Sequence, residues 1–165
     1  MTRNMSIDLD IEKGERRQIT ALFYDMVGST TMVNNMDVED FREIQQAVHQ
    51  AAHRAIAANG GHLDLLMGDG GSAYFGYPVA SEDAPLQAVL AGLAILKECA
   101  KAAEDFEEPV RIRVGIATGS AVAGQAGRGA LATRDEIIGI APTLAARIQG
   151  EANVGTVAVS NATYK

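Results

Sequence analysis

The sequence predicts an α+β sandwich in which helices pack on a largely antiparallel sheet. Two observations carry this prediction. Segments with the two-residue alternation of strands are interleaved with segments whose apolar residues recur every three or four positions, as in helices. Neighbouring strand-like segments are also separated by short glycine-containing turns, which is typical of antiparallel hairpins. In chain order the elements read β-α-β-β-α-β-β-α-β.

The composition indicates one acidic domain. With 165 residues, of which 47% are hydrophobic, the chain is long enough for one cored domain and short for two. A net charge of −7 argues against a nucleic-acid partner, because such domains usually show a basic face. The single cysteine, Cys99, excludes a disulfide framework and is expected to be a buried small hydrophobe in a reducing cytoplasm. No apolar run reaches the roughly 18 residues that span a bilayer, so we expect a cytoplasmic domain without a membrane segment.

The first predicted strand ends in a carboxylate. Residues 1–15 lack periodicity and are expected to form a flexible lead-in, with the folded domain at 16–165. Residues 18–24 are β-rich and apolar, as in a central strand. Asp25 follows, and then Gly28-Ser29-Thr30, which has the composition of a helix N-terminus with free N–H groups. This combination predicts a divalent cation with phosphate bound to it. The alternative is that Asp25 only caps the helix.

The middle of the chain predicts two helices that flank a hairpin. Asp37 can cap a helix that ends at 59–61. The apolar positions of this helix are Phe41, Ile44, Val48, Ala52 and Ala55. Residues 62–67 and 72–77 read as a hairpin with Asp69 at the tip of a glycine-rich turn, 68–71. A second long helix opens at 81–83 and closes at 107–109. Its expected apolar face consists of Leu86, Leu90, Leu93, Leu96 and Ala100.

The last part of the chain predicts further strands and one helix. Residues 110–118 alternate as a strand, with Arg111 and Arg113 on the face opposite the apolar residues. Solvent is the ordinary reason for two arginines on one face, and an anionic ligand across the sheet is the alternative. The remaining elements are expected to be a return strand at 120–124, a flexible loop at 127–132, a short strand at 136–138, a helix from Pro142 and a last strand at 156–159.

Four separated motifs stand out along the chain: FYDMVGST at 23–30, MGDG at 67–70, RVGIATG at 113–119 and LAAR at 144–147. Together they resemble the catalytic domain of class III nucleotidyl (adenylate/guanylate) cyclases of bacterial type. Each motif is weak alone, but the ordered set is specific. The resemblance covers about 16–165 and implies a ferredoxin-like-derived α+β sandwich. Because family members usually continue into another β-hairpin, it also implies a domain truncated at its C-terminus.

The resemblance implies an enzyme of intracellular signal transduction that converts ATP, or GTP, to a cyclic nucleotide and pyrophosphate. Asp25, Asp69 and the backbone carbonyl of Met26 would hold two Mg²⁺ or Mn²⁺ ions. The β- and γ-phosphates would lie on the backbone amides of Val27, Gly28, Ser29 and Thr30. Arg113 matches the family arginine that contacts the pyrophosphate, and Arg147 the one that stabilises charge on the α-phosphoryl group. In the family the latter arginine comes from the opposite protomer, so a homodimer with two composite sites is implied.

Three positions depart from the family pattern. Leu65 stands where many adenylate cyclases have a purine-reading lysine, and its side chain cannot donate a hydrogen bond. Glu136, with Asp135 beside it, stands in the place of a second purine-reading residue and can serve adenine or guanine. Thr143 replaces an asparagine that orients the ribose. These departures leave two alternatives: an active cyclase, with ATP and GTP both open, or a catalytically degenerate domain that binds nucleotide or regulates.

Two other features have simpler interpretations. His49 and His53 have the spacing of metal ligands on one helix, but no third ligand accompanies them, so we expect ordinary, partly exposed helix residues. The aromatic residues Tyr74, Phe75 and Tyr77 are expected in the core and at the sheet edge rather than as a platform for stacking bases.

Overall fold

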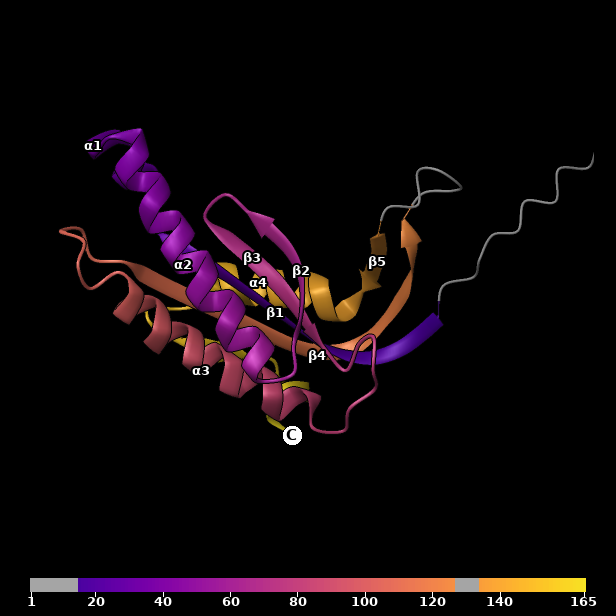
Figure 1. The fold of residues 1–165 in the computed structure, drawn as a ribbon. Helices are drawn as coiled ribbons and strands as arrows, with labels where there is room; N and C mark the ends of the chain where they lie inside the picture. The colour runs from indigo at the N-terminus through magenta and orange to yellow at the C-terminus, as the bar shows by residue number, and fades with distance from the viewer. Residues whose placement is uncertain (1–14, 127–133) are drawn as a thin grey trace, which may run out of the picture.

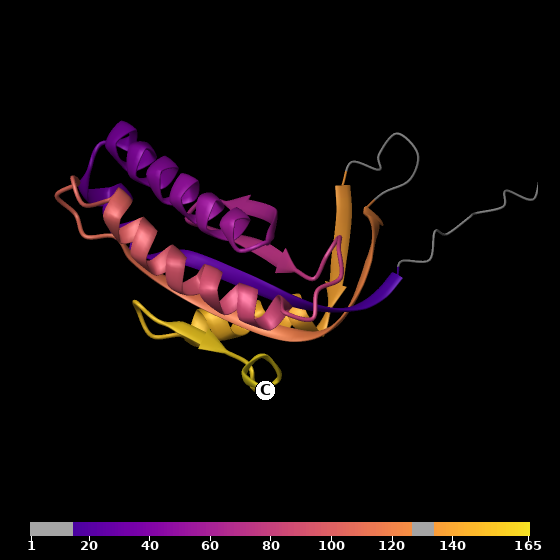
Figure 2. The ribbon, with the colours of Figure 1, turned by 60° about the horizontal axis from the view of Figure 1, so that its bottom comes forward.

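The computed structural model describes residues 15–126 and 134–165, which form a six-stranded sheet with helices on both faces (Figures 1 and 2). The strand order is β2-β3-β1-β4-β5, and β6 pairs with β4. All strand pairs are antiparallel except β4 with β6. The predicted α+β sandwich with a largely antiparallel sheet is therefore confirmed.

The elements follow the predicted order with a few differences. Their bounds are β1 (Glu15–Val27), α1 (Ser29–Asn35), α2 (Val38–Ala58), β2 (His62–Met67), β3 (Gly70–Phe75), α3 (Ala84–Ala102), β4 (Arg111–Ala126), β5 (Arg134–Gly139), α4 (Ile140–Glu151), β6 (Val157–Val159) and α5 (Asn161–Tyr164). Residues 1–14 of the expected lead-in and the expected loop at 127–132 lie outside the described residues. No helix in the described part of the chain is both long and apolar enough to cross a bilayer.

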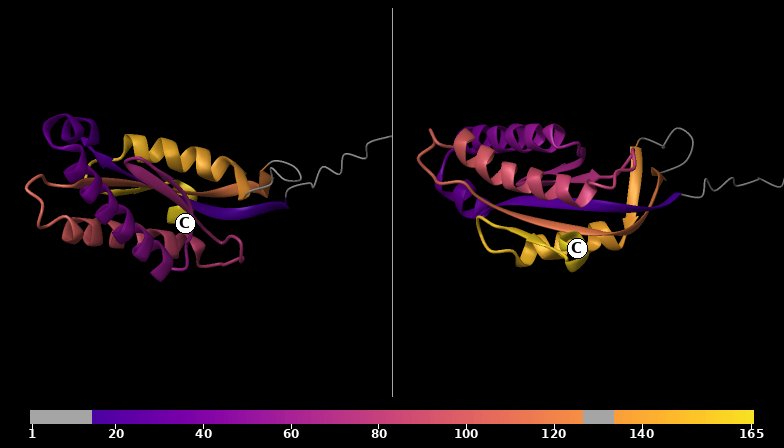
Figure 3. Two further views of the ribbon diagram at one scale, coloured as in Figure 1. Left: turned by 45° about the horizontal axis from the view of Figure 1, so that its top comes forward. Right: turned by 90° about the horizontal axis from the view of Figure 1, so that it is seen from below.

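The two faces of the sheet carry separate cores (Figures 2 and 3). α2 and α3 cover one face, over side chains such as Leu22 and Val114, and α4 covers the other, over Ile19 and Ala117. β1 runs between β3 and β4 and supplies both cores, because successive side chains of a strand point to opposite faces. The expected burial of Cys99 is also confirmed.

β4 is longer than the sequence predicted. Strands were expected at 110–118 and 120–124 with a tight turn between them, but one continuous strand pairs with all 13 residues of β1. Gly119 lies opposite Ile19 within this ladder, and the hairpin partner of β4 is β5. The predicted return strand at 120–124 was therefore wrong. Gly119-Ser120 has the composition of a turn, but pairing with β1 keeps this segment extended.

α3 turns a different face to the sheet from the one expected. In the predicted leucine face, Leu86, Leu90 and Leu93 are 59%, 47% and 52% exposed. The buried side is made mostly of small residues: Ala84, Ala88, Ala91, Gly92, Ile95 and Cys99. A helix approaches a close-packed sheet most nearly where its side chains are small, so packing selected the alanines over the larger leucines.

Several element ends also differ from the prediction. α3 ends at Ala102 rather than at 107–109, α4 begins at Ile140, and α5 follows β6 where no element was expected. The glycine-rich turn of the first hairpin is shorter than predicted, because Gly70 and Gly71 already pair in β3. Asp37 stands at the N-cap of α2 as expected, although its side chain makes no capping hydrogen bond.

Gly115 allows α4 to lie directly against β4, which generates a stability prediction. A Cβ atom at this position would lie 2.2 Å from the amide nitrogen of Gln149 and 2.6 Å from the carbonyl oxygen of Ala145. Both are backbone atoms, so relief requires α4 to shift. We expect Gly115→Ala to lower the free energy of unfolding by about 1–3 kcal/mol in urea denaturation. The matched control is Gly150→Ala, where a Cβ meets nothing within 4 Å, and an equal loss in both variants would contradict this account.

Candidate functional site

Asp25 lies near the end of the central strand, between residues of both neighbouring strands. It is opposite Gly70 of β3 and opposite Arg113 of β4. The approach of β3 is close: a Cβ atom on Gly70 would lie 2.3 Å from the carbonyl oxygen of Tyr24 and 3.0 Å from the Cβ atom of Asp25. Only glycine fits there, so the first glycine of β3 allows the β2–β3 turn to reach Asp25.

Asp69 occupies that turn and forms hydrogen bonds with two residues that follow Asp25 in the chain. The amide of Met26 donates to the carbonyl oxygen of Asp69 at 2.8 Å. The Asp69 carboxylate accepts from the hydroxyl of Ser29 at 2.8 Å, in the first turn of α1. The structure therefore brings together the two aspartates, Met26 and the start of α1, all of which the sequence predicted for one site.

Arg113 forms a two-pronged ion pair with Asp25. Its Nε and Nη2 atoms lie 3.0 and 3.2 Å from the two carboxylate oxygens, and its Nη1 donates to the carbonyl oxygen of Gly150 at 2.9 Å. The hydrogen bond to Asp25 raises the pKa of Arg113 above its usual value, partial burial opposes that shift, and the charges of Asp25, Asp69 and Glu151 add to it. Asp25 thus does not cap α1, whose N-cap is Gly28.

The residues present fit a divalent cation such as Mg²⁺. Asp25, Asp69 and the carbonyl of Met26 offer oxygen atoms, the ligands that hard cations prefer. No group of three or more His, Cys, Asp or Glu that could hold a metal occurs in the described residues. An ion here would thus complete its shell with backbone, water or phosphate oxygens, as Mg²⁺ commonly does.

The segment expected to hold phosphate opens a short helix. α1 begins at Ser29 after Gly28, which has the left-handed φ of 80° that favours glycine. Among the residues that the structure describes, no side chain caps this helix, and the Ser29 hydroxyl bonds to Asp69 instead. The start of α1 is therefore tied directly to one of the two aspartates. Val27 ends β1 just before this helix, and Thr30, the second residue of α1, is exposed.

A pocket of about 330 Å³ brings together three further predicted residues. Leu65, Glu136 and Thr143 all line it, although they come from β2, β5 and α4. Phe23 also lines it and precedes Asp25 by two residues, so both side chains belong to the face of β1 that α4 covers. Arg147 lies one helical turn after Thr143 and is exposed, and it has no ion-pair partner among residues 15–126 and 134–165.

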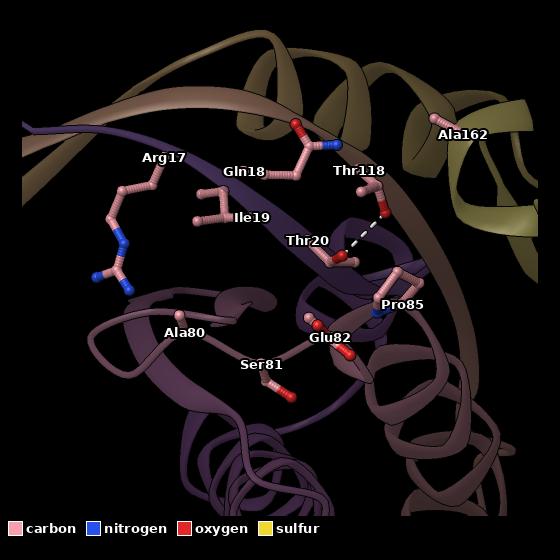
Figure 4. Close-up of a pocket in the computed structure, with 11 residues that line it drawn as sticks. Arg17, Gln18, Ile19, Thr20, Ala80, Ser81, Glu82, Pro85, Thr118 and Ala162 are labelled. Atoms are coloured by element: carbon pink, nitrogen blue, oxygen red, sulfur yellow. Dashed lines mark hydrogen bonds between the residues drawn. The ribbon is translucent and has the colours of Figure 1, made fainter.

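A second pocket, of about 580 Å³, lies between β1, β4 and the start of α3 (Figure 4). Its lining includes Thr20 and Thr118, whose hydroxyls lie 2.8 Å apart. A series of hydrogen bonds continues from Thr118 to Thr163 at 2.9 Å and from Thr163 to Ser160 at 3.0 Å. The described lining of this second pocket includes none of the predicted site residues, so the candidate functional residues are those of the 330 Å³ pocket and of the segments that carry the two aspartates.

Two residues of α2 touch the site, and sequence reasoning missed both. Gln45 and His49 donate to the carbonyl oxygen of Gly68, the latter at 2.9 Å, and the other ring nitrogen of His49 lies 2.8 Å from the hydroxyl of Tyr24. His53 is exposed, as expected. The i, i+4 spacing of Gln45 and His49 placed them on one face, but nothing in the sequence indicated which turn that face would meet.

Comparison with known proteins identifies the family of this chain. Residues 11–165 match the model of the adenylate and guanylate cyclase catalytic domain. The chain belongs to that family. An uncharacterized protein of Rhizobium meliloti (strain 1021) is 38% identical over 154 residues, which is 93% of this chain and 15% of that protein. The chain thus spans less than a fifth of the length of this relative.

Solved cyclase structures share the fold. The guanylyl cyclase Cya2 superposes with a TM-score of 0.83 at 28% identity, over 92% of this chain and 78% of that one. The adenylyl cyclase CyaB from P. aeruginosa also has a TM-score of 0.83, at 26% identity over 92% of this chain and 81% of that one. The guanylate cyclase domain of RhGC from Catenaria anguillulae, in complex with GTP, has a TM-score of 0.79 at 21% identity, over 91% of this chain and 82% of that one, which is a likeness of fold alone. The neighbours therefore include enzymes for each purine.

The ion pair at the site generates a prediction that can be measured without turnover. We expect Arg113→Gln, in EDTA, to lower the free energy of unfolding by about 0.5–1 kcal/mol, because two carboxylates lose their cationic neighbour. Added Mn²⁺ should restore more stability to the variant than to the parent, since the ion replaces the lost charge. Arg111→Gln is the control, because Arg111 is exposed on the same face of β4. Identical urea denaturation curves for the two variants would contradict a role for the pair.

Proposed function

We propose that this domain is an active nucleotidyl cyclase that converts ATP to cyclic AMP and pyrophosphate. The observation that carries the proposal is the placement of Asp25 and Asp69 at one end of the sheet. The backbone amide of Met26, the residue after Asp25, donates a hydrogen bond to the carbonyl oxygen of Asp69. Family membership supports the reaction class, and the pocket lined by Leu65 and Glu136 supports a bound base. Such an enzyme would work in intracellular signal transduction in the cytoplasm.

The proposed reaction is an internal displacement at phosphorus. The 3′ oxygen of the ribose forms a bond to the α-phosphorus and loses its proton to water. The bond from the α-phosphorus to the bridging oxygen breaks, and pyrophosphate leaves with the electron pair. Two divalent ions, held by Asp25, Asp69 and the carbonyl of Met26, would favour the ionised 3′ hydroxyl and neutralise charge on the leaving group.

Each remaining predicted residue has a role in binding or charge stabilisation. We assign the backbone amides of Val27–Thr30 to the β- and γ-phosphates, and Arg147 to the charge that develops on the α-phosphoryl group. Thr143 would contact the ribose with its single hydroxyl, and Glu136 would accept hydrogen bonds from the base. Both line the same pocket, which supports their assignment to one nucleoside.

Arg113 has two anionic partners in this proposal. In the structure its guanidinium is bonded to the Asp25 carboxylate, which is also a proposed ion ligand. We propose that nucleotide and ions together displace it, so that Arg113 moves from Asp25 to the pyrophosphate group. Arg113 would keep an anionic partner throughout this exchange, because the N–H groups of a guanidinium can form paired hydrogen bonds with carboxylate or with phosphate oxygens.

We propose a homodimer with two composite sites. Arg147 is exposed, and in the described part of the chain it lacks an ion-pair partner, which suits a side chain that serves the site of a second copy. Each site would then combine Asp25 and Asp69 from one copy with Arg147 and the pocket of Leu65, Glu136 and Thr143 from the other. A C2 arrangement produces two such sites at once.

One observation favours a second candidate function. Leu65 and Thr143 both line the pocket, and neither offers the amine or amide that the family pattern has at these positions. A domain that binds nucleotide without turnover, and acts as a regulatory module, would tolerate both changes. The two candidates share the nucleotide site and differ only in catalysis.

An assay of the purified chain separates the candidates. With ATP and Mn²⁺, we expect cyclic AMP and an equal amount of pyrophosphate, and no product from Asp25→Asn or Arg147→Ala. A mixture of these two inactive chains should regain activity, because one composite site of the heterodimer keeps both residues. Binding of Mn²⁺-ATP without product would establish the regulatory candidate. Failure to complement, with heterodimers detected, would contradict the composite site.

The purine pocket generates a prediction about substrate choice. Because Leu65 supplies no hydrogen bond, we expect only a modest preference for ATP over GTP in kcat/KM. Leu65→Lys should sharpen this preference by roughly tenfold to a few hundredfold, since its ammonium can donate to adenine N1 but opposes the guanine N1 donor. Leu66→Lys, at the adjacent exposed position, is the control. An unchanged ratio in Leu65→Lys would place that residue outside the base site.

A further inference from the structure

His49 bridges the two chain segments that carry the aspartates. It projects from α2, which lies beside the β2–β3 hairpin in Figure 1, and its ring is partly buried. Its Nδ1 atom lies 2.8 Å from the hydroxyl of Tyr24, and its Nε2 atom lies 2.9 Å from the carbonyl oxygen of Gly68. The two aromatic rings also meet edge to face, with centroids 6.0 Å apart.

Each partner of His49 directly precedes one of the aspartates. Tyr24 comes before Asp25, and Gly68 comes before Asp69. The Gly68 carbonyl belongs to the peptide unit that also contains the nitrogen and Cα atom of Asp69, and that unit is planar. A hydrogen bond to this carbonyl therefore restricts the orientation from which the Asp69 side chain departs. The same ring holds the tyrosine beside Asp25.

The chemistry of the partners determines which atom donates in each bond. A carbonyl oxygen only accepts, so Nε2 carries a proton and donates to Gly68. In the neutral ring Nδ1 then accepts, and the hydroxyl of Tyr24 donates to it. Burial, with a smaller contribution from Cys99, raises the pKa of Tyr24 well above its usual range, so the hydroxyl keeps its proton at neutral pH.

Gln45 strengthens the same contact from one helical turn earlier. Its Nε2 donates to the Gly68 carbonyl, which thus receives two side-chain donors from α2. Gly68 is otherwise exposed at the tip of the hairpin and has a positive φ of 26°. Without these donors the tip would present its carbonyl to water, with no contact to α2 through that atom.

We propose that His49 is a positioning residue that sets the spacing of the Asp25 and Asp69 carboxylates for divalent-ion binding. The inference rests on the proposed function, because it concerns the same two carboxylates. Some residues do not bind the metal but form hydrogen bonds that orient its ligands. Their replacement typically lowers metal affinity about 10- to 100-fold. The magnitude is large because ligand oxygens must lie within about 0.2 Å of their ideal distances to an ion.

The competing explanation is that His49 only packs α2 on the hairpin. That role predicts a loss of stability in variants but an unchanged affinity of the folded protein for ions. A positioning role predicts weaker ion binding at temperatures and urea concentrations where the variant is fully folded. The two explanations therefore differ in a measurement that does not depend on turnover.

The experiment compares Mn²⁺ binding in variants of the full chain. Mn²⁺ affinity is measured by electron paramagnetic resonance with α,β-methylene ATP present, and urea denaturation of each variant is measured in parallel. His49→Leu removes both hydrogen bonds, and we expect it to weaken Mn²⁺ binding by about 10- to 100-fold. His49→Gln places an amide donor near the former Nε2 position, and we expect it to recover part of the affinity. His53→Gln, one turn along α2 and exposed, should bind as the parent does.

Each outcome supports or overturns the proposal. Parent-like Mn²⁺ affinity in folded His49→Leu would overturn the positioning role and leave the proposed function intact. If His49→Leu does not fold, His49→Asn decides: it lacks the reach to Gly68, so parent-like affinity in that variant overturns the role. A parent chain that binds no Mn²⁺ with the nucleotide analogue would overturn the proposed function, and this inference with it.

Discussion

The ion pair between Asp25 and Arg113 is the interaction on which the rest of the site depends. The hydrogen bond from the Met26 amide to the Asp69 carbonyl oxygen brings a second carboxylate to the same end of the sheet, and a nearby positive charge stabilises ionised carboxylates. Arg113 supplies that charge in the structure and is itself anchored to the end of α4. One guanidinium therefore links β1, β4 and α4 at the point where the chemistry is proposed to occur.

Small residues let the elements come close enough for these contacts. Gly70 allows β3 to lie against Asp25, and Gly115 allows α4 to lie on β4. The alanine side of α3 has the same effect on the opposite face of the sheet. Small residues therefore stand at the points where these helices and this turn approach the sheet most closely.

The sequence predicted the parts of the site that depend on local pattern. Asp25 and Asp69 became candidates because each stands at the end of a predicted strand and belongs to an ordered set of motifs, and the predicted Leu65 and Glu136 line one pocket. Contacts between distant elements could not be predicted. The bond from His49 to the β2–β3 turn depends on the rotation of α2 about its axis, which no local pattern fixes. The leucine side of α3 was misassigned because hydrophobicity alone does not report how closely a helix can approach.

The buried hydroxyls of Thr20 and Thr118 protect the strand pairing against slippage. They lie directly opposite each other on β1 and β4, and both belong to a hydrogen-bonded series that reaches α5. A slip of one residue would set Thr20 against Ala117 or Gly119 and leave hydroxyls without partners in the core, a cost of about 1–3 kcal/mol for each. The same slip would separate Asp25 from Arg113. The threonine pair therefore favours one register of β1 and β4. The register that pairs the two buried hydroxyls is also the one that places Asp25 opposite Arg113, five residues further along β1.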